Sequence, residues 1–363
     1  MNVVVKIGTS SLTAESGELD TAAMVKLCAE VAATRADGHR VILVSSGAIA
    51  AGLPALGLAQ RPRDVGVLQA VAAVGQPRLM EQFGRCFGAH GLVPGQVLLT
   101  SQDFGQRTQY LHARETLARL LDLGVVPVVN ENDTVADDEI RYGDNDRLAA
   151  LVAHLTGADL LVMLTDTPGV FTADPRIDAG ASLIEEIVEV DAALEAVAGG
   201  AGTARGSGGM ASKLAAAKIA AWSGIRAVIA GAREPDVLGR VLAGDATVGT
   251  VVQPRSERLP SRKLWIAFAR AASGRLTVDP GARRALVEGN RSLLPAGVTG
   301  VAGDFDAGDA VEIEDPDGRV FAKGIAGAGA AVVRGAVGRR TDDLPDGVPH
   351  EIVHRDDLVI LPA

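Results

Sequence analysis

Short, mostly apolar segments alternate with longer Ala- and Leu-rich segments through about the first 250 residues, and this alternation constrains the fold more than any other feature. The short segments are rich in Val, Ile and Leu on both faces, which indicates buried strands. They cover residues 3–7, 40–45, 96–100, 125–129, 159–165 and 225–230. The longer segments predict helices over residues 21–37, 65–90, 107–123, 146–156 and 209–223. Strands of this kind separated by helices predict an α/β fold, a three-layer sandwich with a mainly parallel central sheet.

The pattern of apolar and polar segments changes after the polar, proline-containing segment QPRSERLPSRK (253–263). We interpret this segment as part of a linker over 253–270. Beyond it, short strand-like pieces stand between Gly- and Asp-rich turns, at residues 276–279, 310–315 and 319–326. This pattern predicts a small, mostly β domain over 271–363. We therefore expect one domain over 1–252, the linker, and a C-terminal domain.

Charge and cysteine content narrow the classes of function. The 363 residues hold 35 Lys and Arg against 45 Asp and Glu, which disfavours a protein that grips phosphate backbones through bulk charge. The two cysteines, Cys28 and Cys86, are far apart and form no CxxC motif, so a zinc site is not expected and we interpret them as reduced thiols. The apolar runs are too short for a signal peptide or a membrane span, so we expect a soluble, cytoplasmic protein without membrane contact.

Polar residues gather at the ends of four predicted strands. They are Lys6 and Gly8 at the first, Ser46 and Gly47 at the second, Asn130 and Asp133 at the fourth, and Thr165 and Asp166 at the fifth. In an open α/β sheet, ligands bind beyond the carboxyl ends of the strands. A lysine inside an otherwise apolar strand is costly unless it emerges or meets a charge, which makes Lys6 a candidate functional residue.

Residues 130–146, NENDTVADDEIRYGDND, carry seven acidic side chains and one basic side chain between two apolar runs. Carboxylates and amides are acceptors for an amine-bearing substrate, and we expect this loop to hold the ammonium group of a small one. The tip, ADDEI (136–140), is interpreted as a solvated hairpin tip. The loop ends in Asp144, Asn145 and Asp146 just before a predicted helix, so Asp146 is also placed to cap that helix.

A glycine-rich segment, GSGGMASK (206–213), precedes the last predicted helix of this region. Its glycines would let backbone N–H groups approach a phosphate, and a helix N-terminus favours anions. The GK[ST] ending of a P-loop is missing, and many such glycine clusters are plain loops, so the segment carries little weight alone. Lys213 lies about one turn into the helix, where a lysine is usually a solvated surface residue.

Together the two lysines, the glycine-rich segment, the hydroxyl-bearing turns and the acidic loop form the set that phosphoryl transfer requires. Cations and backbone N–H groups must neutralise the phosphoryl oxygens, and Mg²⁺ must bridge the phosphates. None of the six histidines lies in these motifs. We therefore expect catalysis by positioning and charge neutralisation.

The same motifs resemble the amino acid kinase family. They are KIGTS (6–10), VSSGAIAAG (44–52), NENDTV (130–135) with GDND (143–146), MLTDTPGVFTADPR (163–176) and GSGGMASK (206–213). The C-terminal stretches LTVDPGARRAL (276–286) and RSLLPAGV (291–298) resemble the PUA domain appended to bacterial members that phosphorylate glutamate. The resemblance covers essentially the whole chain.

The resemblance implies an ATP-dependent, Mg²⁺-requiring kinase that phosphorylates the γ-carboxylate of L-glutamate, the first step of proline biosynthesis. It also implies feedback inhibition by proline and a homo-oligomer, often a tetramer. Lys6 and Lys213 would stabilise the transferring phosphoryl group, and Asp146 would organise them. The implied substrate-binding residues are Ser46, Gly47, Asn130, Asp133, Asp144 and Asn145. The implied ATP-binding residues are Lys6, Gly8, Thr165, Asp166, Ser207, Gly208, Gly209, Met210, Ala211, Ser212 and Lys213. Magnesium ligands other than the ATP phosphates stay unassigned.

Three alternatives stay open. A sister kinase acting on acetylglutamate, aspartate, carbamate or a nucleoside monophosphate would keep the fold and the ATP site, although the acidic loop and the C-terminal domain favour glutamate. An RNA-binding protein is disfavoured, because residues 271–363 hold ten Lys and Arg against fifteen Asp and Glu, with two aromatic residues. A regulatory amino-acid-binding protein without catalysis is disfavoured by the presence of both Lys6 and Lys213. The division of roles between Asp144 and Asp146 is also open, with Asp146 the more catalytic in our interpretation.

Overall fold

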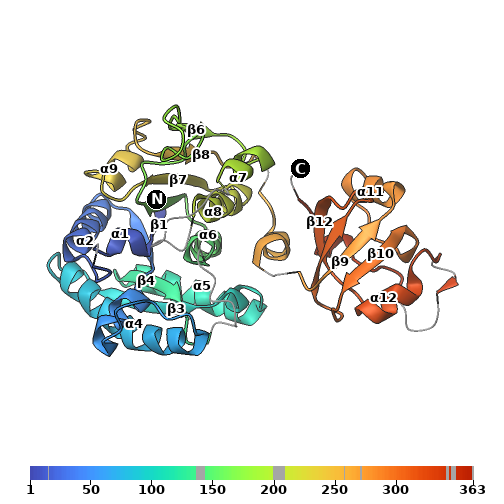
Figure 1. The fold of residues 1–363 in the computed structure, drawn as a ribbon, viewed down its shortest axis with the longest axis horizontal. Helices are drawn as coiled ribbons and strands as arrows, with labels where there is room; N and C mark the ends of the chain where they lie inside the picture. Colours follow the sequence, from blue (N-terminus) through green and yellow to red (C-terminus); the bar gives the residue numbers. More distant parts are fainter. Residues whose placement is uncertain are drawn as a thin grey trace. The chain divides into compact units, whose positions relative to one another are not determined.

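The computed structural model describes residues 1–14, 16–135, 144–198, 209–256, 258–269, 272–340, 343–344 and 349–361 (Figure 1). The chain divides into two compact units, Met1–Arg258 and Leu259–Ala363. Each unit has its own sheet and its own hydrophobic core.

The first unit is built on an eight-stranded sheet with the strand order β3-β4-β2-β1-β5-β7-β8-β6. Neighbouring strands pair in parallel, except that β7 and β8 are antiparallel. The predicted α/β class and mainly parallel sheet are thereby confirmed. The strands are β1 (Asn2–Ile7), β2 (Arg40–Ser45), β3 (Pro94–Leu99), β4 (Val126–Glu131), β5 (Leu160–Thr165), β6 (Glu186–Ile187), β7 (Arg226–Gly231) and β8 (Thr250–Val252).

Helices cover both faces of this sheet (Figure 1). On one face, α2, α4 and α9 pack into a single core with the strands. On the other face, α6 lies against β1 and contacts α8 and α5. The helices are α1 (Thr9–Leu12), α2 (Thr21–Ala36), α3 (Ala48–Gly52), α4 (Val65–Gly88), α5 (Arg107–Asp122), α6 (Asp144–Thr156), α7 (Ala192–Ala198), α8 (Met210–Trp222) and α9 (Val237–Leu242).

The alternation of side chains along β1 determines where Lys6 lies. Val3, Val5 and Ile7 belong to the core formed with α2 and α4. Because successive side chains of a strand point to opposite faces, Lys6 lies on the other face, which α6 covers. A single lysine in the middle strand of the sheet is thus directed at the helix that carries Asp146.

Two glycines let α3 and α4 cross in close contact. A Cβ atom added at Gly75 of α4 would lie 1.7 Å from the carbonyl oxygen of Ala48, and one at Gly52 of α3 would lie 2.1 Å from that of Val71. Both distances are far inside van der Waals contact, so only glycine fits at these two positions. The crossing fixes the backbone of α4 against the turn that follows β2.

The second unit has a five-stranded sheet with the order β10-β9-β11-β12-β13. Its mostly β character was predicted. Leu264 and Ile266, which fall in the segment interpreted as a linker, are buried in short helical turns, α10 (Ser261–Leu264) and η3 (Trp265–Ala269). The remaining elements are β9 (Gly274–Val278), α11 (Pro280–Val287), β10 (Val298–Gly303), β11 (Ala310–Glu314), β12 (Val320–Ile325), α12 (Ala330–Ala336) and β13 (Leu358–Ile360).

Two further findings concern the cysteines and the question of a membrane-spanning helix. Cys28 and Cys86 are free, buried thiols, and burial raises the pKa of each. Within the described ranges, no helix combines the length and apolar character needed to cross a membrane.

Candidate active site

Asp146 lies buried between the two lysines that the sequence analysis singled out. Its Oδ1 atom is 2.6 Å from Nζ of Lys6, and its Oδ2 atom is 3.3 Å from Nζ of Lys213. Asp146 is 0% exposed, and the two lysines are 4% and 5% exposed. The helix α6 begins at Asp144, so Asp146 stands inside its first turn. One carboxylate therefore joins β1, α6 and α8 at the carboxyl edge of the sheet.

The charges at this centre shift the pKa values of its members. Burial lowers the pKa of Lys6 below its ordinary value, and Lys213 lowers it further, while Asp146 opposes the shift. Burial acts to raise the pKa of Asp146, but the two ammonium groups and hydrogen bonds from Lys6 and Ser212 outweigh it and lower that pKa overall. Asp146 is therefore held as a carboxylate between two cations.

The N-terminal turn of α8 is attached to the same carboxylate. The hydroxyl of Ser212 donates a hydrogen bond to Oδ2 of Asp146 at 2.6 Å. Gly209 precedes the helix with an extended backbone, and α8 starts at Met210. The described end of the glycine-rich segment thus presents a helix N-terminus beside Lys213, an arrangement that suits a phosphate.

A chain of amide side chains runs away from Asp146 on the side of β2 and β4. Nδ2 of Asn145 donates to Oγ of Ser46 at 2.8 Å and to Oδ1 of Asn130 at 3.0 Å. Nδ2 of Asn130 donates in turn to Oε1 of Gln76 at 2.9 Å. The adjacent Gly47 has a φ of 112°, a left-handed backbone that starts α3 and favours glycine. Of the predicted substrate-binding side chains, Asn145 is therefore in direct contact with both Ser46 and Asn130.

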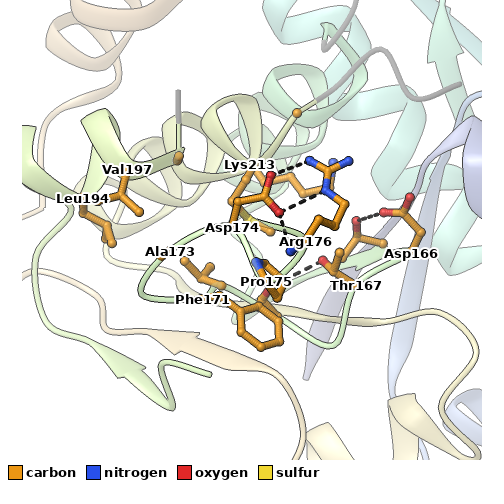
Figure 2. A pocket seen from close by; sticks show the side chains of 16 residues that line it. Asp166, Thr167, Phe171, Ala173, Asp174, Pro175, Arg176, Leu194, Val197 and Lys213 are labelled. Atoms are coloured by element: carbon orange, nitrogen blue, oxygen red, sulfur yellow. Dashed lines mark hydrogen bonds and ion pairs between the residues drawn. The ribbon is translucent and has the colours of Figure 1, made fainter. Parts of the chain in front are cut away.

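A cavity of about 310 Å³ opens on the other side of Lys213 (Figure 2). Its volume is at the lower end of the range for small-molecule sites. Five of the predicted ATP-binding residues line it, namely Thr165, Asp166, Gly209, Met210 and Lys213. Lys6, Gly8, Ala211 and Ser212 lie outside its lining. A Cβ atom at Gly8 would lie 3.3 Å from Nζ of Lys6, so the loop after β1 passes close to that cation.

Residues that were not predicted as site residues also line the cavity. Figure 2 shows the apolar side chains of Leu194 and Val197 at one end and Asp166 at the other. Arg176 donates two side-chain hydrogen bonds to Asp174, at 3.0 and 2.7 Å. The hydrogen bonds from Arg176 hold the pKa of Asp174 at about 2, so this carboxylate is ionised. The motif 163–176 contains both residues, so a signal for them was present in the sequence.

Asp133 is half-buried in the turn after β4, and Asp144 starts α6. Ser207 and Gly208 lie outside the described residues, as does the predicted hairpin tip at 136–140. Within the described residues, no group of three or more His, Cys, Asp and Glu side chains is placed to hold a metal ion.

Gln76 was missed entirely. It lies on α4, far in sequence from every motif, and it contacts Asn130 next to the close crossing of α3 and α4. A polar residue in a buried helix face was the only available signal.

A mainly parallel sheet with a lysine-flanked carboxylate at its carboxyl edge and a cavity of about 310 Å³ beside one lysine is typical of a phosphate-handling α/β protein. Comparison with known families agrees with this class: the amino acid kinase family matches residues 1–231, and the PUA domain matches residues 274–348. The chain belongs to the amino acid kinase family, with a PUA domain at its C-terminal end.

Curated relatives match the chain over nearly its full length. A glutamate 5-kinase from Frankia casuarinae is 51% identical, covering 99% of this chain and 96% of the relative. A glutamate 5-kinase from Moorella thermoacetica is 46% identical over the same shares of the two chains. A third, from Nitrosospira multiformis, is 48% identical over 99% of this chain and 97% of its own.

Proposed function

We propose that this protein transfers the γ-phosphoryl group of ATP to the γ-carboxylate of L-glutamate, as a glutamate 5-kinase. The observation that carries the proposal is Asp146, buried between Lys6 and Lys213, with a cavity beside one lysine and an amide cluster beside the carboxylate. The names of the curated relatives agree with it. The proposal assigns the reaction to the domain over 1–252, followed by the linker 253–270 and the PUA-like domain 271–363.

The reaction needs no general base. A γ-carboxylate oxygen attacks the γ-phosphorus, a new O–P bond forms, and the bond from phosphorus to the β–γ bridging oxygen breaks as ADP leaves. A carboxylate is already a nucleophile at neutral pH, so the enzyme must bring the reactants together and neutralise their charge. Lys6 and Lys213 supply two cations for the transferring phosphoryl oxygens. Asp146 is the third catalytic residue, because it holds both ammonium groups at one place.

The amide cluster forms the amino-acid side of the site. Asn145 and Asp146 are neighbours on α6, so a substrate held by Asn145 lies next to the lysine centre. Ser46 and Asn130 bind Asn145 directly. Gly47, Asp133 and Asp144 complete the proposed substrate-binding set.

The cavity beside Lys213 forms the nucleotide side. Leu194, Val197 and Phe171 offer apolar surface for a base, while Thr165 and Asp166 lie at the end of β5. Gly8 and the segment 207–213 are assigned to the phosphates. Mg²⁺ fits the site as a partner of the ATP phosphates, and its chemistry there is to neutralise their charge. Asp166 is an exposed carboxylate on the cavity wall and would supply an acceptor oxygen for such an ion.

Inhibition by proline, a homo-oligomeric state, with a tetramer as the expected form, and a cytoplasmic location also belong to the proposal. They follow from the family resemblance. RNA is not a proposed partner.

The test is an assay with Mg-ATP, L-glutamate and hydroxylamine, which traps an acyl phosphate as γ-glutamyl hydroxamate. Aspartate, acetylglutamate and UMP are tested in parallel as substrates, and their phosphorylation is monitored by the release of ADP. The proposal predicts hydroxamate from L-glutamate and its suppression by proline. ADP release with one of the other substrates and none with L-glutamate would instead assign the site to a sister kinase.

A further inference from the structure

Gln76 is a buried polar side chain on the apolar face of α4. It is 8% exposed, and its neighbours Ala72 and Leu79 on the same helix are 2% and 0% exposed. A buried amide is costly unless its polar atoms find partners. The partner of its Oε1 atom is Nδ2 of Asn130, at 2.9 Å, while its Nε2 atom is buried and has no hydrogen-bond partner among the described residues.

The direction of hydrogen bonding along the amide chain is fixed from the backbone. The N–H of Glu131 can only donate, and it donates to Oδ1 of Asn130 at 2.9 Å. The side-chain oxygen of Asn130 is therefore turned toward Glu131 and Asn145, and its Nδ2 is turned toward Gln76. That Nδ2 is buried and needs an acceptor, which Gln76 supplies.

The same direction determines what Asn145 presents. Its Nδ2 donates to Asn130 and Ser46, so its Oδ1 faces away from both. Among the described residues, this Oδ1 atom is buried and has no hydrogen-bond partner. A buried acceptor without a donor next to a lysine-flanked carboxylate is a place for a donor on the substrate.

The crossing of α3 and α4 holds Gln76 at its position. Gly75 precedes it and lies against the carbonyl oxygen of Ala48 so closely that a Cβ atom would not fit. The α4 backbone therefore has no room to move toward α3, next to the residue that carries the amide bonded to Asn130.

We propose that Gln76 is a positioning residue that sets the polarity of the Asn130–Asn145 amide chain, so that Asn145 presents its carbonyl oxygen to the ammonium group of the amino-acid substrate. The inference rests on the proposed function. Gln76 acts through Asn130 and Asn145 and contacts neither ATP nor the phosphoryl group. Its effect is on recognition of the amine, which separates glutamate from a dicarboxylate of the same length.

The test compares L-glutamate with glutarate, which lacks only the amino group, in wild type and in two variants. Gln76→Met removes the acceptor at nearly the same size, and Gln76→Glu keeps an acceptor oxygen. We expect Gln76→Met to raise KM for L-glutamate about tenfold, the usual scale for losing one hydrogen bond, and to leave kcat/KM for glutarate and KM for ATP unchanged. Gln76→Glu should keep most of the preference for L-glutamate over glutarate. Gln82→Met, the same exchange at a half-buried position of α4, is the matched control.

A double variant separates positioning from general support of the fold. In an Asn145→Ala background, Gln76→Met should have no further effect on KM for L-glutamate, because the residue through which it acts is gone. Additive effects, or equal losses with glutamate and glutarate, would overturn the inference. If Gln76→Met does not fold, Gln76→Leu gives the same comparison. Absence of glutamate phosphorylation in the wild type would instead refute the proposed function.

Discussion

Nζ of Lys6 on β1 lies 2.6 Å from Oδ1 of Asp146 on α6, in an ion pair that is almost wholly removed from solvent. A buried ion pair contributes little net stability, since desolvation offsets most of the attraction, but it fixes both groups in place. Lys213 shares the same carboxylate from the other side. Burying two ammonium groups around one carboxylate is costly, so the arrangement indicates a function that needs two cations at one point. Phosphoryl transfer has this requirement.

Removing the charge of Asp146 should damage both stability and turnover. Asp146→Asn leaves two buried ammonium groups without a counter-charge, and we expect a loss of about 3–5 kcal/mol in the free energy of unfolding. We also expect kcat to fall about a hundredfold or more. Asp122→Asn is the control, because the Asp122–Arg40 pair is exposed and should contribute less than about 1 kcal/mol. Urea unfolding and steady-state kinetics measure both effects. Equal losses of unfolding free energy in the two variants would show that the buried Asp146 pair contributes no more than an exposed pair.

The two lysines of α8 should differ sharply. Lys213→Met removes a cation from the proposed phosphoryl site, and we expect kcat to fall about 10²–10³-fold. Lys218→Met breaks a pair with Glu195 on the same unit at 2.7 Å, and we expect kcat to stay within about twofold of wild type. Hydroxamate formation at saturating substrate provides the measurement. Near-normal turnover of Lys213→Met would remove this lysine from the catalytic set.

The stability contribution of Asp146 should depend on pH in a defined direction. Its folded-state pKa is lowered below the ordinary 3.8, so the folded protein binds fewer protons than the unfolded chain in that window. The contribution is present above pH 3.8 and is lost as pH falls through the folded-state pKa. The difference in unfolding free energy between wild type and Asp146→Asn should therefore be constant near neutrality and shrink below pH 3.8. A difference that grew toward low pH would contradict the assignment.

The close crossing of α3 and α4 should tolerate no side chain at Gly75. Gly75→Ala forces the helices apart, and we expect a loss of about 1–3 kcal/mol in unfolding free energy, with weaker glutamate binding through displaced Gln76. Gly84→Ala is the control on the same helix, since a Cβ atom there meets nothing within 4 Å. It should stabilise the protein by roughly 0.5–1 kcal/mol, because alanine is the better helix former. Thermal unfolding of both variants decides the point.

The long elements of the first unit could be predicted from the sequence because burial on both sheet faces leaves a strong apolar signal. The short strands β6 and β8 could not, because they have only two and three residues and the antiparallel pairing of β8 with β7 depends on where the chain returns. In the second unit, α11 had a readable signal that was missed: Asp279 accepts a hydrogen bond from the N–H of Ala282, and Pro280 is the first helical residue.

The site shows the same division. Lys6 was predictable because a charged side chain inside an apolar strand is costly unless it emerges from the strand or meets an opposite charge. Asn145 and Asp146 were predicted as site residues from the motif GDND just before a helix expected at 146, whereas the helix begins at Asp144 and holds both residues in its first turn. Arg176 lies in the motif 163–176 and pairs with Asp174 two residues away, so its signal was present but was not used. Gln76 could not be derived, because its role depends on which distant backbones approach one another. Nothing in a single sequence states that α4 passes within hydrogen-bonding reach of β4.

The central claim is that a γ-carboxylate oxygen of L-glutamate attacks the γ-phosphorus of ATP at the lysine-flanked site. The most direct measurement uses glutamate labelled with ¹⁸O in its γ-carboxylate, with Mg-ATP and hydroxylamine, and mass analysis of the released phosphate. The account predicts one ¹⁸O atom in each phosphate that accompanies hydroxamate, and loss of this transfer in Lys213→Met. Phosphate without label in wild-type protein that hydrolyses ATP would show attack by water, and would contradict the proposed reaction.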